Sequence, residues 1–255
     1  MLSAQRRLYI SDELQQSGLA QVSDLAERLG VSEMTIRRDL EMLERMTDVV
    51  RIRGGAMLRR HGTAFEPLWD AKVAVRNEAK ARIGKAAAAR VKPGETILLD
   101  SGTTTLRVAR SLSFACSVVT VDVKIAVELA SRPSSDGMQT LLVGGAVRSG
   151  FFCTTGYFAL EMLEQLHVDH AFLGADAIDA DAGVTNATVE EAAIKKRIIA
   201  AASEVVLVAD ASKLGIVALS KVASLDAIDL WITDEAIDPE RLAHVRSVGL
   251  NVEVV

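Results

Sequence analysis

The sequence predicts an α/β protein made of a small, mostly helical N-terminal domain and a larger, Rossmann-like domain with a mostly parallel sheet. Two patterns predict this arrangement. In the first 60 residues, short helical patterns of apolar residues precede a run in which apolar residues and Arg alternate. From residue 76 onward, short apolar runs of strand type alternate with helical patterns, which is typical of a parallel sheet covered on both faces. We therefore expect domains at residues 1–60 and 76–255, joined by a linker at 61–75.

The composition is that of a globular protein in a reducing compartment. Of the 255 residues, 49% are hydrophobic, 25% are charged and only 4% are aromatic, so Ala, Val, Leu and Ile must form the core. Cys116 and Cys153 are the only cysteines, which argues against a disulfide scaffold. The N-terminus lacks the apolar stretch of a signal peptide, and no apolar run is long enough to span a membrane. We expect a cytoplasmic protein with no membrane partner.

Charge is distributed unevenly along the chain. The formal net charge is −5, which argues against nucleic-acid binding by the whole surface. The first 60 residues, however, carry ten Arg and no Lys against nine acidic residues, and eight of these Arg lie between Arg28 and Arg60. Arg suits bidentate contact with phosphates and guanine edges, so any contact with DNA is expected in the N-terminal domain.

The N-terminal patterns predict a helix-turn-helix. Helices are expected at residues 8–16, 22–29 and 33–45, with Gly30 as a left-handed cap of the second helix and Ser32 as the N-cap of the third. A short helix, a tight turn and a helix with an Arg-bearing outer face form the motif whose second helix enters the major groove of DNA.

The third helix and the segment after it supply the predicted DNA contacts. Ile36, Leu40 and Leu43 recur at helical spacing and are expected to be buried, which places Arg38 on the outer face. Residues 49–56 then alternate apolar residues and Arg before paired glycines, as in a wing. An ordinary solvated helix face with an ion pair one turn apart is the alternative interpretation. The predicted DNA-binding residues are Ser32, Thr35, Arg37, Arg38, Arg51 and Arg53.

Four loops of the larger domain follow predicted strands and carry polar groups. Ligands of parallel sheets bind beyond the carboxyl ends of the strands, so these loops are expected to share one site. Residues 100–105, Asp-Ser-Gly-Thr-Thr-Thr, offer hydroxyls and helix-start N–H groups to a phosphate. The other loops are residues 144–148, 174–179 and 209–215, which add glycine backbone, Arg148, Asp176 and Lys213. This combination suits a phosphorylated sugar or polyol. Capped turns and surface cations are the alternative interpretation.

These motifs resemble the DeoR family of bacterial transcriptional regulators. The N-terminal match is Val-Ser-Glu-Met-Thr-Ile-Arg-Arg-Asp-Leu at 31–40 with Arg-x-x-Gly-Gly-Ala at 51–56. The C-terminal matches are Asp100-x-Gly102-Thr103-Thr104, Gly144-Gly145-x-x-Arg148, Gly174-x-Asp176, Glu191-x-x-x-Lys195-Lys196 and Ala209-Asp210-x-Ser212-Lys213-x-Gly215. The resemblance spans about residues 5–235. It implies a winged helix-turn-helix, a sensor domain related in fold to ribose-5-phosphate isomerase, and assembly as a dimer or tetramer.

With the resemblance included, the predicted effector site is larger than the four loops alone. The predicted effector-binding residues are Asp100, Ser101, Gly102, Thr103, Thr104, Thr105, Thr120, Gly144, Gly145, Arg148, Gly174, Asp176, Glu191, Lys195 and Lys213. Two positions depart from the family pattern. Arg53 replaces the usual His before the paired glycines, and Val121-Asp122 stands where the family often has Asn, which bears on the choice of effector.

The resemblance implies a sensor rather than an enzyme. The isomerase motif Asp-Gly-Ala-Asp is Leu-Gly-Ala-Asp at residues 173–176, and Ala187 replaces the isomerase Lys. Proton transfer between sugar carbons needs a positioned base, so this acid/base set is incomplete. We expect a repressor of a carbohydrate-metabolism operon, without cofactor or metal, that a phosphorylated effector releases from an operator in double-stranded DNA. The alternatives are an isomerase-like enzyme fused to a DNA-binding domain and a ligand-free oligomerising scaffold.

Overall fold

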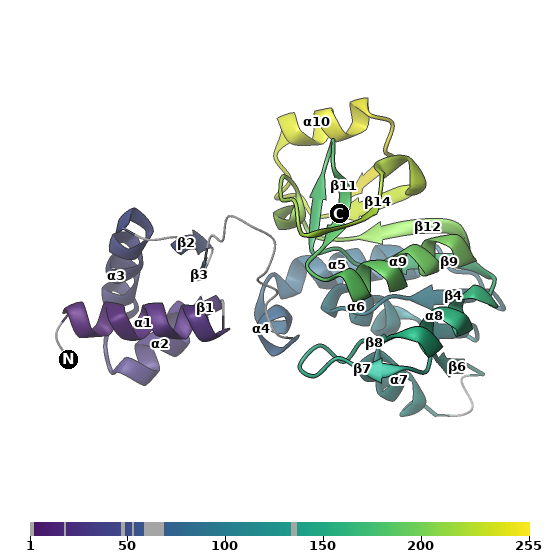
Figure 1. Ribbon diagram of the computed structural model, residues 1–255, viewed down its shortest axis with the longest axis horizontal. Coiled ribbons are helices and arrows are strands. Elements are labelled where there is room, and N and C mark those ends of the chain that lie inside the picture. The colour runs from purple at the N-terminus through teal and green to yellow at the C-terminus, as the bar shows by residue number, and fades with distance from the viewer. Residues whose placement is uncertain (1–2, 18, 47–48, 53, 59–68, 134–136) are drawn as a thin grey trace. The chain divides into compact units, whose positions relative to one another are not determined.

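The computed structural model describes residues 3–17, 19–46, 49–52, 54–58, 69–133 and 137–255 (Figure 1). The chain divides into two compact units, Met1–Ala71 and Lys72–Val255. None of the described helices is both long enough and apolar enough to cross a membrane.

The N-terminal unit has the three predicted helices and a small sheet. Its elements are α1 (Ser3–Ser17), β1 (Leu19–Gln21), α2 (Val22–Leu29), α3 (Glu33–Met46), β2 (Val49–Ile52) and β3 (Gly55–Leu58). The antiparallel strands lie in the order β1-β3-β2, so the β2–β3 hairpin forms a wing. Ile36, Leu40 and Leu43 are buried with residues of α1 and α2, which confirms the predicted apolar face of α3. Strand β1 was not expected, because three residues carry no periodicity.

Glycine is required at two positions of this unit for different reasons. Gly30 has φ +62° and closes α2, as predicted, because its N–H bonds back to the last turn of the helix. Gly55 is needed for a different reason. A Cβ atom at this position would lie 2.3 Å from the main-chain oxygen of Ala20, so only glycine lets β3 pair with β1.

The larger unit alternates strands and helices along the chain. Its first half contains α4 (Trp69–Ala74, which begins in the N-terminal unit), α5 (Asn77–Ala88), β4 (Thr96–Leu99), α6 (Thr103–Ser111), β5 (Ser117–Thr120), α7 (Val123–Ala130), β6 (Gln139–Leu142), β7 (Ala146–Val147), β8 (Thr154–Thr155) and α8 (Tyr157–Glu164). Its second half contains β9 (Val168–Leu173), β10 (Ala177–Asp179), β11 (Gly183–Asn186), α9 (Val189–Ala201), β12 (Ala202–Val208), the short 3-10 helices at Ala211–Lys213 and Leu225–Ala227, β13 (Ser220–Ala223), β14 (Leu230–Thr233), α10 (Pro239–Ser247) and β15 (Val252–Val254).

Among the described residues, seven parallel strands form one sheet in the order β15-β14-β12-β9-β4-β5-β6. The predicted parallel α/β domain is therefore confirmed. Helix α5 packs on α6, and α8 packs on α9 (Figure 1). The chain builds outward from β4 toward β6 and then outward from β9 toward β15. The direction of strand addition thus reverses between β4 and β9, and such a reversal is the usual place for a ligand.

Several small elements were not predicted. They are the β7–β8 hairpin, the antiparallel sheet β10-β11-β13, helix α10, and helix α4 inside the expected linker. The apolar pattern of residues 106–112 predicts a helix there, but α6 begins three residues earlier, at Thr103. The threonines of the first loop therefore lie in the first turn of a helix.

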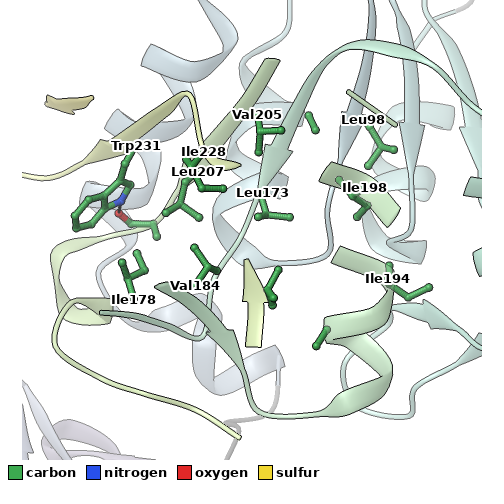
Figure 2. Packing of buried hydrophobic residues seen from close by; sticks show 14 of the residues in the cluster. Leu98, Leu173, Ile178, Val184, Ile194, Ile198, Val205, Leu207, Ile228 and Trp231 are labelled. Atoms are coloured by element: carbon green, nitrogen blue, oxygen red, sulfur yellow. Dashed lines mark hydrogen bonds between the residues drawn. The ribbon is translucent and has the colours of Figure 1, made fainter. Parts of the chain in front are cut away.

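The core of the larger unit includes residues of the two strands at the reversal point, β4 and β9 (Figure 2). Leu98 and Leu173 come from the two central strands, and they join Leu207 of β12 and Ile198 of α9 in one buried cluster. The indole N–H of Trp231 donates to the main-chain oxygen of Ala209 at 2.9 Å, so the largest buried side chain leaves no polar group unpaired. This rigid base fixes the strand ends that carry the polar loops.

Candidate functional site

The outer face of α3 is open to solvent in the N-terminal unit. Met34 is 61% exposed, and Arg38, one turn further along, is also exposed. Arg37 pairs with Glu33 at 2.9 Å, one turn before it, as in an ordinary solvated helix. Within the described part of the chain, the guanidinium of Arg38 has no side-chain partner. Arg38 is therefore the predicted DNA-binding residue that is most available to a ligand.

The start of α3 is capped as the sequence predicted. The N–H of Thr35 donates to the hydroxyl of Ser32 at 3.3 Å, and the two hydroxyl oxygens lie 2.9 Å apart. Ser32 is exposed. Hydroxyls at the start of a helix that enters the major groove are well placed to meet a DNA phosphate.

Arg51 of the wing is paired with acidic residues of its own domain. The guanidinium of Arg51 binds the carboxylate of Glu41 at 2.7 Å and that of Glu44 at 3.0 Å, and both acids belong to α3. Arg51 thus fastens the wing to the recognition helix, and its contact with DNA stays a prediction. Arg53 lies outside the described residues.

Asp39 has a structural role that the sequence analysis missed. Its carboxylate is buried within α3 and receives the guanidinium of Arg6, with Arg7 at 3.6 Å. Both arginines belong to α1. The sequence contains one indication of this ion pair. Asp39 is an acidic residue next to the apolar Leu40, on a helix whose outer face carries Arg.

The reversal point of the larger unit holds a buried ion pair. Asp100 follows β4, and its carboxylate accepts the N–H of Gly174 at 2.9 Å and the ammonium of Lys195. Lys195 also donates to the main-chain oxygen of Gly174 at 3.0 Å. Burial opposes the charge of Lys195, but Asp100 and Glu191 outweigh it and raise the pKa of this lysine. Lys195 therefore joins the loops after β4 and β9 as a cation.

A second cluster lies beside this pair. The guanidinium of Arg148 binds Glu191, and the ring of Phe151 lies 4.1 Å from the guanidinium carbon. The other carboxylate oxygen of Glu191 accepts the amide of Asn186 at 3.1 Å. Of the two partners that the sequence suggested for Arg148, a phosphate or an acidic neighbour, the structure shows the acidic neighbour.

Three lysines interact electrostatically with the carboxylate of Asp176, just after β9. They are Lys72, Lys195 and Lys213, and Lys72 pairs with it directly at 3.2 Å. The N–H of Ala187 donates to the second oxygen at 3.1 Å. Burial opposes the charge of Asp176, but the lysines outweigh burial and hold its pKa well below the usual range.

The first loop forms an open helix start. Gly102 has φ +152° and precedes α6, which has no side-chain N-cap. Thr105 turns its hydroxyl back to the main-chain oxygen of Gly102 at 2.9 Å. Among the described residues, the hydroxyls of Thr103 and Thr104 have no hydrogen-bond partner. Free hydroxyls and N–H groups at a helix N-terminus attract an anion.

Two predicted site residues, Thr120 and Gly145, contact the protein's own backbone. Thr120 donates to the main-chain oxygen of Leu99 at 2.9 Å and accepts the N–H of Asp122 at 3.1 Å, so its hydroxyl is already used. A Cβ atom at Gly145 would lie 2.5 Å from the main-chain oxygen of Thr155, so this close approach is within the β7–β8 hairpin. Gly144 is exposed and meets no such neighbour.

Asp122, which was expected to bear on the choice of effector, is the N-cap of α7. One of its oxygens accepts the N–H groups of Lys124 and Ile125 at the start of α7, and the other accepts the hydroxyl of Ser101 and the N–H of Gly102. Burial raises the pKa of Asp122 to about 6, although these four hydrogen bonds oppose the rise. Asp122 thus ties α7 to the first loop.

Replacing Asp122 by Asn is expected to remove a pH dependence of the free energy of unfolding. Because burial raises the pKa in the folded state, protonation stabilises the fold. This stabilisation is complete below the reference pKa of 3.8 and is lost as the pH rises through about 6. Wild type and D122N should differ in their free energies of unfolding, and this difference should change by on the order of 1–3 kcal/mol across that pH range. Urea unfolding at several pH values measures it. A difference independent of pH contradicts this account, and D238N, which alters the exposed N-cap of α10, is the matched control.

In the described ranges, no group of three or more His, Cys, Asp or Glu side chains is arranged to hold a metal ion. A shallow depression lies at the start of β15, where Arg246, Asn251 and Glu253 line it. It contains none of the predicted site residues.

Two family models match the two units in turn. The DeoR-like helix-turn-helix domain matches residues 6–61, and the DeoR C terminal sensor domain matches residues 75–235. The chain belongs to the DeoR family. As a member of this family, it is a transcriptional regulator with an N-terminal DNA-binding domain and a C-terminal sensor domain.

Relatives of similar length support this assignment. The HTH-type transcriptional regulator GlpR of Haloferax volcanii is 34% identical over 254 residues, which cover 99% of this chain and 98% of that protein. The HTH-type transcriptional repressor GlcR of Bacillus subtilis is 32% identical over 235 residues, which cover 92% and 89% of the two chains. Both are named as regulators of transcription rather than as enzymes.

Among solved structures, ribose 5-phosphate isomerase A from Methanocaldococcus jannaschii is similar to part of this DeoR-family chain. The TM-score is 0.39 at 20% sequence identity, and the match covers 54% of each chain. This distant likeness supports no argument about function.

Proposed function

We propose that this DeoR-family regulator represses a carbohydrate-metabolism operon and that a phosphorylated sugar or polyol controls its affinity for the operator. The observation that carries this proposal is the grouping of polar loops at the reversal point of the sheet. The open start of α6 follows β4, and the lysine-rich surroundings of Asp176 follow the neighbouring strand β9. The start of α6 can bind an anion, and the carboxylate of Asp176 can accept hydrogen bonds. Together they suit a phosphate ester that also carries hydroxyl groups.

The two ends of such an effector would meet different groups. The hydroxyls of Thr103 and Thr104 and the first N–H groups of α6 would hold the phosphate. Lys213 follows β12 and acts electrostatically on Asp176, so it adds positive charge on the opposite side. The carboxylate of Asp176 would accept hydrogen bonds from the sugar hydroxyls.

The charged pairs favour binding over catalysis. A general base for proton transfer between sugar carbons needs a pKa near the working pH and an open position beside the substrate. The pKa of Asp176 is held far below that range. The carboxylate of Asp100 is already bonded to Lys195 and Gly174. These groups are suited to recognising an ester and poorly suited to moving its protons.

Control of DNA binding requires two arrangements of the assembly. In an oligomer, two copies of α3 would read repeated half-sites of the operator. The effector acts only through a difference in its affinity for the DNA-bound and DNA-free arrangements. We propose that it favours the DNA-free arrangement, so that repression ends when the metabolite accumulates.

Replacing Lys213 by Ala is expected to spare operator binding and abolish the effector response, because the lysine belongs to the sensor unit and adds positive charge beside Asp176. A thermal-shift panel of ribose 5-phosphate, glucose 6-phosphate, fructose 6-phosphate and glycerol 3-phosphate first identifies the stabilising ester. At about 100 times its Kd, that ester should stabilise the wild type by roughly 2.7 kcal/mol.

K213A should lose most of this stabilisation, whereas K221A, which changes an exposed lysine of β13, should retain it. The parent sugars without phosphate are the ligand control. If no ester stabilises the wild type, the oligomerising scaffold becomes the better account. If K213A no longer binds the operator, Lys213 has a structural role instead.

A further inference from the structure

We propose that the ion pair between Lys72 and Asp176 is a latch that holds the start of the sensor unit on the effector site and opens when an anionic ester binds there. Lys72 is then a positioning residue that links the occupancy of the site to the DNA-binding domain. This inference rests on the proposed function, and it adds a residue that the sequence did not single out.

Lys72 lies at the point where the chain enters the sensor unit. It is the first residue of that unit and belongs to α4. Its ammonium lies 3.2 Å from a carboxylate oxygen of Asp176, and both side chains are largely buried. Its main-chain oxygen accepts the ammonium of Lys80 at 2.6 Å. The covalent connection from the DNA-binding domain therefore enters the sensor unit at a residue that is fixed to the effector loop.

The next anchor along the chain is independent of Asp176. Arg76, at the start of α5, binds Asp234 at 3.0 Å and Asp210 at 3.6 Å, beyond the ends of β14 and β12. Loss of the contact at Lys72 would leave α5 in place through Arg76. The change would be confined to the few residues between the linker and this second anchor, which is where a signal to the DNA-binding domain must start.

Local charge explains why an ester would open the latch. Asp176 interacts with three lysines at once, so an incoming dianion competes with it for the same cations. Burial is the main cause that lowers the pKa of Lys80 to about 8. Asp210 opposes this shift, and the charges of Lys213 and Lys72 add to it. Several lysines therefore repel one another around Lys72, and a bound anion would lower this repulsion.

The test measures operator affinity without any ester. The operator is first selected by the wild-type protein from a pool of random-sequence DNA. The variants K72M and D176N each break the latch, and each should weaken ligand-free operator binding by about fivefold or more, at the lower end of allosteric coupling. The double variant should be no weaker than either single variant, because both remove the same contact.

Two further variants separate the latch from general damage. K72R keeps a cation that can reach Asp176 and should retain most of the operator affinity. K85M removes an exposed lysine of the neighbouring helix α5 and should bind the operator like the wild type. Thermal melting of each variant shows that it is folded, and D176N tests the pair without altering Lys72.

The outcomes distinguish the latch from the proposed function. Wild-type operator affinity in ligand-free K72M and D176N overturns the latch, whatever the esters do. Weakened and non-additive binding in these variants, with a wild type that responds to no ester, shows that the ion pair supports operator binding. This outcome contradicts the proposed effector and the opening of the latch by an ester. An ester that lowers operator binding equally in the wild type and K72M overturns the latch and leaves the proposed function standing.

Discussion

Replacing Lys195 by Met is expected to destabilise the sensor unit by about 3–5 kcal/mol, because the change leaves the buried carboxylate of Asp100 without its cation. The loss follows from the position of the pair at the reversal point of the sheet, where no solvent compensates the charge. Urea unfolding of the isolated variant measures it directly.

Two companion variants test the cause of this loss. K196M removes the neighbouring lysine, which is exposed, and should change the free energy of unfolding by less than about 0.5 kcal/mol. The double variant D100N/K195M buries no unpaired charge and should recover a large part of the stability. A double variant as unstable as K195M would show that packing, rather than charge, explains the effect.

Replacing Arg38 by Ala is expected to weaken specific operator binding by about 1–3 kcal/mol and to relax the base preference at one position of each half-site. The reason is the exposed position of Arg38 on the outer face of α3, with no partner among the described side chains. Fluorescence anisotropy with the selected operator and with single-base variants of it measures both effects.

Arg37 and Arg28 provide the comparison for Arg38. Arg37 is paired with Glu33, so R37A should weaken binding to all sequences alike if it meets only phosphate. Arg28 is paired with Glu13 on α1, and R28A should have little effect on either measure. An R38A protein with unchanged affinity and unchanged base preference would remove Arg38 from the DNA-reading surface.

Much of the fold could be predicted because its signals are local. The buried face of α3 follows from the spacing of Ile36, Leu40 and Leu43, and the cap at Ser32 follows from one residue type at one place. The strand at residues 96–99 is a short apolar run, and the structure has it at the same bounds. Each of these features depends on neighbours within a turn or a strand.

The missed features depend on partners far apart in the sequence. Arg51 appeared to be a free wing cation, but Glu41 and Glu44 on α3 hold it after the wing folds back. Lys72 lay in the expected linker at residues 61–75, and only the fold brings it to Asp176, more than a hundred residues away. Sheet β10-β11-β13 likewise joins strands separated by α9 and β12.

The candidate site shows the same division. The loop motifs correctly marked which strand ends carry polar groups, because motif residues are contiguous. They did not show that Arg148 is bonded to Glu191 or that Asp122 caps α7. Hydrogen-bond partners decide whether a polar residue serves a ligand or the fold, and those partners appear only in three dimensions.

The most direct test of the account is the operator affinity of the full chain with and without a saturating concentration of the stabilising sugar phosphate. We predict that the ester lowers this affinity by about fivefold or more, in keeping with the usual range of allosteric coupling, and that the parent sugar does not. Equal affinities in the presence and absence of the ester would contradict the claim that the sensor domain controls DNA binding through a phosphorylated ligand.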